Sequence, residues 1–550
     1  MPEDILNLKS VPARCAMAVF VVAAVTCLWM ALVPSSAQSH TARAHSPLVT
    51  IDSGTLQGIH LAALPRGAAF LGIPYAAQPV GNLRWKVPQL PPSWSGVRKA
   101  VAYGPACPQA PSPWLPEMLG IQKMPTNEAC LYLNVWTPEL TGAGKLPVLV
   151  WVHGGGNVEG SGEWPPLGPT LARQGIVVVS LNYRLGAFGF FSYPALSAES
   201  RHHVSGNYGH LDQVAALRWV QRNIARFGGD PAHVTIAGQS SGALDICNLM
   251  ASPIAAGLFQ RAILQSGVCV DSVFPSLRAA EANGALLAED LGVQSGPQSL
   301  AKLRAIPAER ILQVAAKDQR VDLEPVVDGW VFREQPAIAF AAGRQAKVAV
   351  MVGSNEDEVS IFASPIVGGK SYRPKTVAEY RQWLQREFDG RADKVFAEYP
   401  AHSDTEVPGV FRTIFTDFDF GFGARLLARD TAQIGQNAFL YHFTYVGAGK
   451  FAELGAFHSE ESMFLSKKYW TTWISRPYDK TLSNAVIGYW VQFVKMGNPN
   501  DRTLPAWPVY DPKTDLCQEL GRRIGPQTVP RAARFKVFQQ VLTSRLQGTE

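Results

Sequence analysis

The sequence predicts an α/β fold, in which helices cover both faces of a large, mostly parallel sheet. Short and nearly continuous apolar runs rich in β-branched residues recur along the chain, as is typical of strands buried on both faces. These runs alternate with Gly-rich turns and segments of helical periodicity, the order that parallel strands joined by crossover helices require. No repeat with a period of about 20–50 residues is present, which argues against solenoids and propellers.

The expected core elements follow one another in order along the chain. Residues 146–152 and 176–181 are the clearest strands. Residues 211–227 carry apolar side chains at steps of three to four positions, which predicts a helix that ends at Gly228-Gly229. A second helix is expected at residues 242–250, and the remaining strands are expected at 233–237, 261–265, 348–353 and 438–444.

Two helical blocks interrupt this alternation. The first occupies residues 272–345, and the second occupies residues 360–435. Thr376-Val377-Ala378-Glu379 in the second block has the capping-box pattern of a helix start. We therefore expect one domain over residues 47–540, in which both blocks are insertions that roof the sheet.

The N-terminal segment has the features of an export signal. Lys9 and Arg14 precede an apolar run at residues 15–33, and small residues follow up to Ala37. This pattern predicts a signal peptide at residues 1–37. The run is longer than a usual signal core, so an uncleaved membrane anchor remains an alternative. We expect residues 38–46 to be a disordered linker and the protein to be secreted or periplasmic, without stable membrane insertion if cleavage occurs.

Composition excludes several classes of protein. The chain has 550 residues, of which 47% are hydrophobic and 17% are charged. A chain this apolar can bury enough surface to fold, which excludes intrinsic disorder. The formal net charge of +6 comes from scattered basic residues, so we expect no nucleic-acid partner. No clustered His/Cys ligand set is visible, and we expect neither a metal nor an organic cofactor.

Five cysteines remain once the predicted signal peptide is removed: Cys107, Cys130, Cys247, Cys269 and Cys517. An odd number leaves at least one free thiol. The best candidate disulfide joins the first two, because they bracket a Pro-rich loop. The alternative is that both are small buried residues, and the spacing alone does not decide between them. The sequence does not assign the states of the other three.

The first chemical signal is Gly238-Gln239-Ser240-Ser241-Gly242, a G-x-S-x-G motif. It lies between a predicted strand and a predicted helix. In this context Ser240 occupies a sharp turn, and side chains at the two glycine positions would collide with neighbouring backbone. The motif alone is weak evidence, because short Gly/Ser patterns also arise by chance. The strand–turn–helix context makes Ser240 a candidate nucleophile.

A nucleophilic serine needs a pocket that stabilises negative charge. His153-Gly154-Gly155-Gly156 follows the strand at 146–152, and such a glycine run lets backbone N–H groups face a cavity. The N–H groups of Gly155 and Gly156 could act together with that of Ser241. A flexible loop or a phosphate-binding nest is the alternative, although a P-loop is excluded because no G-K-S/T follows.

The remaining partners are expected in the chain order serine, acid, histidine. Ser354-Asn355-Glu356-Asp357-Glu358 places carboxylates directly after the strand at 348–353, where active sites of α/β proteins form. Downstream of them, His442 lies inside an apolar strand and His402 lies in a surface turn. His458 follows a Gly-rich loop, which suggests mobility and reach toward the serine. It is the candidate base.

Several longer segments resemble one family. They are residues 70–76 (FLGIPYA), 131–136 (LYLNVW), 206–213 (GNYGHLDQ), 227–231 (FGGDP) and 497–500 (GNPN) with Trp507-Pro508. With the serine motif, these segments are highly specific. The chain resembles the type-B carboxylesterases, the family that includes the cholinesterases, from about residue 47 to 515.

The resemblance implies the α/β-hydrolase fold and a set of site residues. It implies that Ser240 is the nucleophile, that Glu358 is the acid, and that His458 is the general base. It also assigns the oxyanion N–H groups to Gly155, Gly156 and Ser241, and makes a Cys107–Cys130 disulfide the expected pairing.

Five positions depart from the family pattern. Ala129 replaces an aspartate, which weakens a structural contact rather than the chemistry. Gln239 replaces a glutamate, which makes a strongly cationic substrate less expected. Ser241 replaces an alanine, and little effect is expected because its backbone N–H is the functional group. Val359 replaces a glycine beside the acid and puts the local turn in question. Asn157 replaces an aromatic residue, so a more polar acyl side of the pocket is expected.

These observations together predict an exported serine esterase. It would hydrolyse a small-molecule carboxylic ester, bulky or aromatic, through an acyl-enzyme intermediate and without a cofactor. One alternative is a non-catalytic ligand-binding or adhesion protein of the same fold. The other is an amidase or peptidase, because the same triad can open amides.

Overall fold

The computed structural model describes residues 46–62, 64–110, 124–140, 145–317, 320, 322–363, 374–447, 449–469, 472–473 and 476–548. Residues Ser46–Glu550 form one compact unit. The expected signal peptide at 1–37 and all but the last residue of the expected linker at 38–46 lie outside the described residues. Among the described residues, no helix is both long and apolar enough to span a membrane.

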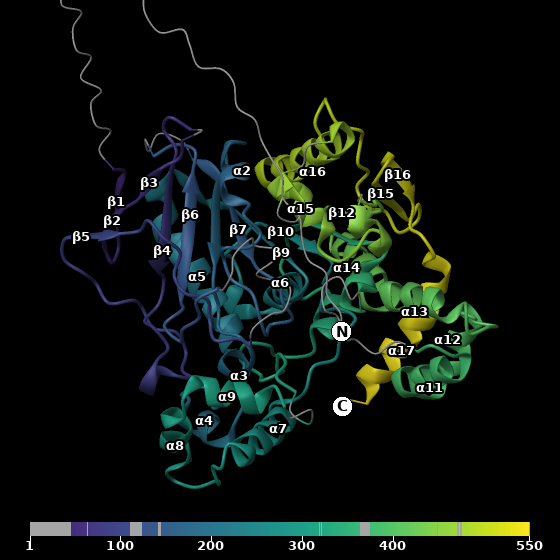
Figure 1. The fold of residues 1–550 in the computed structure, drawn as a ribbon, viewed down its shortest axis with the longest axis horizontal. Coiled ribbons are helices and arrows are strands. Elements are labelled where there is room, and N and C mark those ends of the chain that lie inside the picture. Colours follow the sequence, from purple (N-terminus) through teal and green to yellow (C-terminus); the bar gives the residue numbers. More distant parts are fainter. Residues whose placement is uncertain are drawn as a thin grey trace, which may run out of the picture. The chain divides into compact units, whose positions relative to one another are not determined.

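A large sheet forms the centre of the molecule (Figure 1). In the described part of the chain it has 11 strands, in the order β16-β15-β12-β11-β10-β9-β7-β8-β6-β4-β3. The pairs from β8 to β15 are parallel, and antiparallel pairs occur at both edges. The bounds are β3 Ile59–His60, β4 Ala68–Pro74, β6 Tyr132–Thr137, β7 Leu146–Val152, β8 Val177–Leu181, β9 Gly229–Gln239, β10 Arg261–Gln265, β11 Ala349–Asn355, β12 Ala438–Phe443, β15 Leu516–Leu520 and β16 Ile524–Thr528.

The apolar runs form strands because both of their faces are buried. In β7, Val148, Val150 and Val152 pack into one core, whereas Leu149 and Trp151 pack into the other. The first core includes α5 (Tyr208–Asn223), α6 (Ser241–Ala251) and α14 (Phe422–Gln433). The second includes α2 (Gly168–Ala172) and α16 (Pro477–Met496), near α15 (Glu460–Ser466). The predicted α/β fold with helices on both faces is confirmed.

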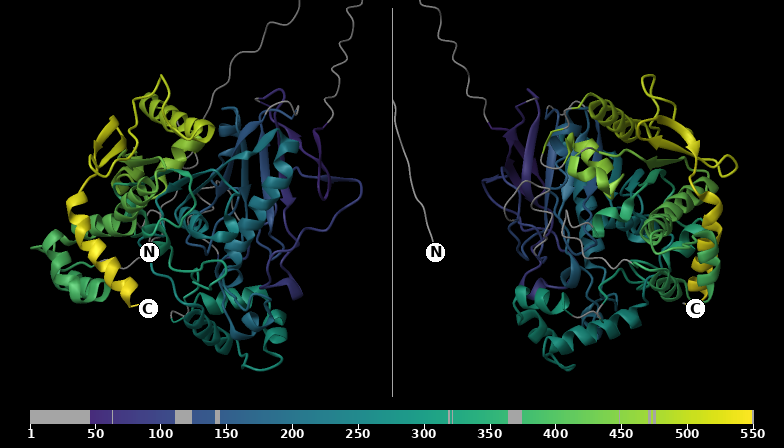
Figure 2. Two further views of the ribbon diagram at one scale, coloured as in Figure 1. Left: turned by 180° about the vertical axis from the view of Figure 1, so that it is seen from behind. Right: turned by 45° about the vertical axis from the view of Figure 1, so that its right-hand side comes forward.

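The helical blocks expected between the strands are present. The first contains α7 (Leu277–Asp290), α8 (Ser299–Ala305), α9 (Ala308–Ala315) and α10 (Pro336–Ala341). The second contains α11 (Val377–Phe388), α12 (Ala392–Glu398) and α13 (Val407–Thr416), beside the C-terminal α17 (Phe535–Gln547) (Figure 2). The predicted capping box is confirmed, because the Glu379 N–H donates to Thr376 Oγ1 and the Thr376 N–H donates to the Glu379 carboxylate.

Smaller elements complete the fold. A side sheet contains β1 (Leu48–Ile51), β2 (Gly54–Gln57) and β5 (Val97–Lys99), and a hairpin contains β13 (Lys468–Tyr469) and β14 (Thr472–Trp473). Helices α3 (Gly186–Gly189) and α4 (Pro194–Glu199) precede α5. The short helical turns are η1 Gly81–Leu83, η2 Ile224–Phe227, η3 Pro253–Ala255, η4 Glu358–Ala363, η6 Asp389–Arg391, η7 Asp417–Gly421, η8 Gly449–Leu454 and η9 Ala532–Arg534.

The structure contains two disulfides. Cys107 is bonded to Cys130, the expected pair, and Cys247 is bonded to Cys269. Within the described residues, Cys517 is the free cysteine, and it is buried. The second disulfide joins α6 to the segment after β10, so it ties together two elements that leave the sheet beside Ser240.

Candidate active site

Ser240 lies in the turn between β9 and α6. Its backbone has φ 58° and ψ −130°, a conformation that non-Gly residues rarely adopt and that is typical of a nucleophile elbow. A Cβ atom at Gly242 would lie 2.3 Å from the Val152 carbonyl oxygen, and one at Gly238 would lie 2.8 Å from the backbone of Gly242. The motif glycines are therefore required by close backbone packing around the serine.

His458 and Glu358 form a buried hydrogen-bonded pair. The Nδ1 atom of His458 lies 2.5 Å from Glu358 Oε2, and the backbone N–H of Asn355 donates to the other carboxylate oxygen at 2.7 Å. The imidazole is 5% exposed, and the rings of Phe362 and Phe420 pack beside it. Packing and the carboxylate hold the ring in this structure, although a Gly-rich loop precedes it.

The second nitrogen of His458 contacts the residue next to the nucleophile. The Nε2 atom lies 2.9 Å from Nε2 of Gln239. Since Nδ1–H is donated to Glu358, Nε2 accepts from the Gln239 amide. Nε2 is the nitrogen that would receive a proton from Ser240, so Gln239 competes for it in this structure. The sequence analysis treated Gln239 only as a lost charge, and no sequence signal indicated this contact.

The glycine loop after β7 lies against the elbow. Gly155 and Gly156 have φ of +113° and +63°. A Cβ atom at Gly154 would lie 2.5 Å from the Gln239 carbonyl oxygen and 3.0 Å from Ser240 Cβ. Among the hydrogen bonds of the described residues, none uses the backbone N–H of Gly155, Gly156 or Ser241. The glycine loop therefore packs against the elbow, and Gly156 and Ser241 line one cavity together with Ser240.

Two side chains of this region make contacts that the sequence analysis did not predict. Asn157 lines the cavity, and its amide also donates to Asp245 and accepts from Tyr183 in the interior. The hydroxyl of Ser241 accepts a hydrogen bond from the backbone N–H of Asn157 at 3.1 Å. Both contacts join residues far apart in the chain, and no local motif predicts them.

A second buried carboxylate lies near the pair. Asn355 Nδ2 donates to Glu461 Oε2 at 2.6 Å, and Gln265 Nε2 donates to Oε1 at 2.9 Å. Burial, together with the negative charge of Glu358, raises the pKa of Glu461. Asn355 thus connects the two acids, since its backbone contacts Glu358 and its side chain contacts Glu461.

Ser240 opens into a cavity of about 490 Å³. Elbow and glycine-loop residues, including Gly156 and Ser241, line part of it. The lining residues from the two helical blocks and from α17 include Phe274, Leu323, Glu324, Glu387, Phe418, Asp419, Phe420 and Arg545. Both blocks therefore contribute to the wall of this cavity.

The cavity lining outside the elbow and the glycine loop, here called the far wall, contains four acids and Arg545. Desolvation by the surrounding protein raises the pKa of Asp271 to about 7 and that of the solvent-exposed Glu324 to about 7, with the charge of Asp322 adding to the second shift. Desolvation also raises the pKa of Asp419, whose side chain reaches solvent, to about 8, with repulsion from Asp271 and Glu387 adding to it. The carboxylate that the family pattern places at position 239 is absent, yet carboxyl groups line the far wall. Within the described residues, no group of three or more His, Cys, Asp or Glu side chains could hold a metal ion.

Comparison with known proteins assigns the family. The model of the carboxylesterase family matches residues 45–537. The fumonisin B1 esterase of Sphingopyxis macrogoltabida is 38% identical over 470 residues, which cover 83% of this chain and 84% of the relative. The chain belongs to the carboxylesterase family. This confirms the predicted resemblance, and it makes the protein a carboxylic ester hydrolase.

Other relatives of this carboxylesterase agree. Liver carboxylesterase 1 of Oryctolagus cuniculus is 33% identical over 505 residues, with 82% of this chain and 85% of the relative covered. A crystal structure of a carboxylesterase of Geobacillus stearothermophilus superposes with a TM-score of 0.77 at 31% identity, covering 90% of this chain and all of that one. A PNB esterase structure gives 0.76 at 30% identity, with the same coverage. The predicted α/β-hydrolase fold is thereby confirmed.

Proposed function

We propose that this carboxylesterase cleaves its ester through Ser240, His458 and Glu358. The observation that carries the assignment is the buried pair of Glu358 and His458. The second ring nitrogen of His458, Nε2, contacts Gln239, the residue adjacent to Ser240. The catalytic cycle begins when the Ser240 hydroxyl replaces the Gln239 amide at Nε2. His458 then takes the hydroxyl proton as Oγ attacks the ester carbonyl carbon.

The tetrahedral species places its negative charge beside the glycine loop. The N–H groups of Gly155, Gly156 and Ser241 donate to that oxygen, and losing one such donor typically costs about 3–4 kcal/mol of transition-state stabilisation. His458 returns the proton to the leaving alcohol, and the acyl group stays on Ser240. Water, deprotonated by His458, then releases the acid and restores the serine.

The natural substrate is proposed to be a bulky ester. A cavity of about 490 Å³ is large enough for a drug-sized molecule. One relative is a fumonisin B1 esterase. The acidic far wall favours a neutral or cationic group on the part of the substrate that reaches it. Two disulfides are typical of proteins outside the cytoplasm, and we propose that the protein is secreted or periplasmic.

Ser240→Ala tests the assignment. The expected result is loss of hydrolysis of nitrophenyl esters by a factor of about 10,000 or more, together with loss of stoichiometric labelling by a fluorophosphonate at this residue. Ser272→Ala is the matched control, because Ser272 lines the same cavity away from the glycine loop. Full activity of Ser240→Ala would refute the proposal.

Substrate class is tested on the wild-type protein. Esters with short and bulky acyl groups are compared by kcat/KM, and each is paired with the amide of the same acid. We expect bulky esters to be the better substrates and the amides to react much more slowly. Faster turnover of the amides would instead support an amidase, and no turnover of any ester by the folded protein would support a binding function.

A further inference from the structure

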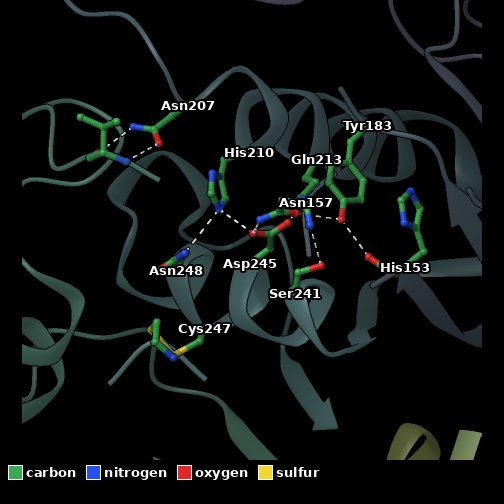
Figure 3. A network of polar contacts seen from close by, with 12 residues as sticks. His153, Asn157, Tyr183, Asn207, His210, Gln213, Ser241, Asp245, Cys247 and Asn248 are labelled. Atoms are coloured by element: carbon green, nitrogen blue, oxygen red, sulfur yellow. Dashed lines mark hydrogen bonds and ion pairs between the residues drawn. A yellow bond between two sulfur atoms is a disulfide. The ribbon is translucent and has the colours of Figure 1, made fainter. Parts of the chain in front are cut away.

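A polar network lies beneath the glycine loop, and Asn157 is at its centre (Figure 3). Asn157 follows Gly155-Gly156 and has φ 58°, a left-handed conformation that asparagine tolerates better than most residues. It is 6% exposed. Its carbonyl oxygen accepts from the Gly186 N–H at 2.7 Å, so its backbone is held on the carbonyl side as well.

Two of its contacts reach the helix that follows the nucleophile. The Asn157 backbone N–H donates to Ser241 Oγ at 3.1 Å, and Nδ2 donates to Asp245 Oδ1 at 2.9 Å. Ser241 and Asp245 are four residues apart in α6 and therefore lie on the same face, one turn apart. One residue of the glycine loop is thus bonded twice to the first turns of the elbow helix.

Asp245 is itself held in place. It is completely buried, and its carboxylate also accepts from Gln213 Nε2 at 2.6 Å and lies 3.0 Å from His210 Nε2. Three donors around one carboxylate offset the cost of removing it from water. Both of these partners come from α5, so the network spans the glycine loop, α5 and α6.

Tyr183 closes the network from the other side. Its hydroxyl lies 3.0 Å from Asn157 Oδ1 and 2.8 Å from the His153 carbonyl oxygen, and its ring stacks on His153. Burial, with the charge of Asp245 adding to it, raises the pKa of Tyr183 well above its usual range. The phenol therefore stays protonated, and its one hydrogen is shared between the His153 carbonyl oxygen and Asn157 Oδ1. The amide nitrogen of Asn157 faces Asp245, because a carboxylate only accepts.

We propose that Asn157 is a positioning residue, which with Ser241 Oγ and Asp245 sets the spacing between the two halves of the oxyanion pocket. One half, Gly155 and Gly156, lies on the glycine loop, and the other half, the Ser241 N–H, lies on α6. Oxyanion donors act only within about 2.7–3.1 Å of the developing charge, so their spacing controls the rate. This inference rests on the proposed function of Ser240.

The first test uses Ser241→Ala and Asn157→Gly. Ser241→Ala removes the hydroxyl that accepts from the Asn157 N–H and that also contacts Tyr183. We expect kcat to fall about fivefold, the effect of about one net hydrogen bond. Asn157→Gly keeps the positive φ but removes the side chain, and we expect kcat to fall about 30- to 100-fold. KM is expected to change less than about threefold in both, because the ground-state ester does not depend on the oxyanion donors.

Two readouts separate positioning from a general loss of stability. Active sites are counted by fluorophosphonate titration, so that kcat refers to folded enzyme. The inhibition constant of a trifluoromethyl ketone, which forms an oxyanion on the serine, is expected to rise in proportion to the loss of kcat/KM. The control is Asn134→Ala, which removes a buried asparagine bonded to Gly72 and Ser180 in the sheet. It should lower the Tm and leave kcat per titrated site unchanged.

Exchanging the two side chains tests the direct hydrogen bond between Asn157 and Asp245. Asn157→Asp alone places two carboxylates together, and we expect a loss of about 100-fold or more, or misfolding. Adding Asp245→Asn restores one donor and one acceptor and should recover at least about tenfold of the activity. Unchanged kcat and inhibitor affinity in Ser241→Ala and Asn157→Gly, or a Tm loss alone, would overturn the inference. If Ser240→Ala remained active, the proposed function would fail instead.

Discussion

The two sides of the active-site cavity differ in how their charges are held. On the nucleophile side, Glu358 and Asp245 are completely buried, and backbone and side-chain groups of the protein donate to their carboxylates. On the far side, the acids at 271, 324 and 419 have raised pKa values of about 7 to 8 and face the substrate space. We infer that the chemistry is preorganised on the nucleophile side, and we propose that the far side selects substrate charge.

The largest expected effect comes from Glu358→Gln, which changes the hydrogen bond between the acid and His458 on the nucleophile side. A glutamine amide can donate to Nδ1 of His458, which would leave the proton on Nε2 and prevent it from accepting the Ser240 proton. We expect kcat to fall about 1,000- to 10,000-fold, measured per titrated site.

Glu461→Gln is the matched comparison for this variant. Glu461 is equally buried and shares Asn355 with Glu358, but it does not contact His458 through any recorded hydrogen bond of the described residues. Its hydrogen bonds go to Asn355 and Gln265, so a neutral amide leaves the contact between Glu358 and His458 in place. A loss below about tenfold is expected, and equal losses in both variants would show that Glu358 has no distinct role.

A smaller effect is expected from adding a charge beside His458. Gln239→Glu places a carboxylate near Nε2, which stabilises the imidazolium. The neutral base would then form only at higher pH, so the acid limb of the kcat profile should move to higher pH. At pH 6 we expect about a tenfold loss, with little change at pH 9. Gln239→Leu removes the contact without adding charge, and a similar shift in that variant would contradict the electrostatic explanation.

The far wall is tested through the charge of the substrate. Below pH 7 the three raised carboxyl groups are mainly protonated and neutral, and above pH 8 they are mainly negative. For a pair of nitrophenyl esters that differ by a terminal carboxylate, we expect kcat/KM of the anionic ester relative to the neutral one to fall about three- to tenfold from pH 6 to pH 9.

The ratio of the two kcat/KM values reports the effect of the far wall alone, because both esters react with the same serine and histidine. Asp419→Asn should flatten the pH dependence of the ratio, and added salt should weaken it. A ratio that is constant with pH in the wild-type protein would show that the wall does not sense substrate charge.

Features that depend on neighbouring residues could be predicted from the sequence, whereas contacts between distant residues could not. Strands such as β7 were predictable because the apolar runs are local, and Ser240 was predictable because its glycines are adjacent to it. The contacts of Asn157 with Asp245, 88 residues away, depend on how the loop meets α6 and have no local pattern. Family resemblance selected Glu358 from three neighbouring acids, which the residues alone did not.

The prediction of a mobile His458 shows why glycine content is an ambiguous signal. Gly455 has φ +67°, and a Cβ atom there would lie 2.1 Å from Asp357 Oδ2. The glycine permits close packing, and the Asp357 carboxylate accepts from the Ala456 N–H. A Gly-rich loop is therefore compatible with a buried and well-held histidine, and the sequence does not distinguish the two cases.

The smallest expected effect lies in the second helical block, at the start of α11. Thr376 Oγ1 accepts from the Glu379 N–H, so Thr376→Ala should cost about 1 kcal/mol of unfolding free energy. Thr376→Ser keeps the hydroxyl and should cost less. The kcat of both variants should equal that of the wild type, because the cap does not touch the nucleophile side. Denaturant titration with parallel assays measures both quantities, and a kcat loss in Thr376→Ala would show that this block also shapes the chemistry.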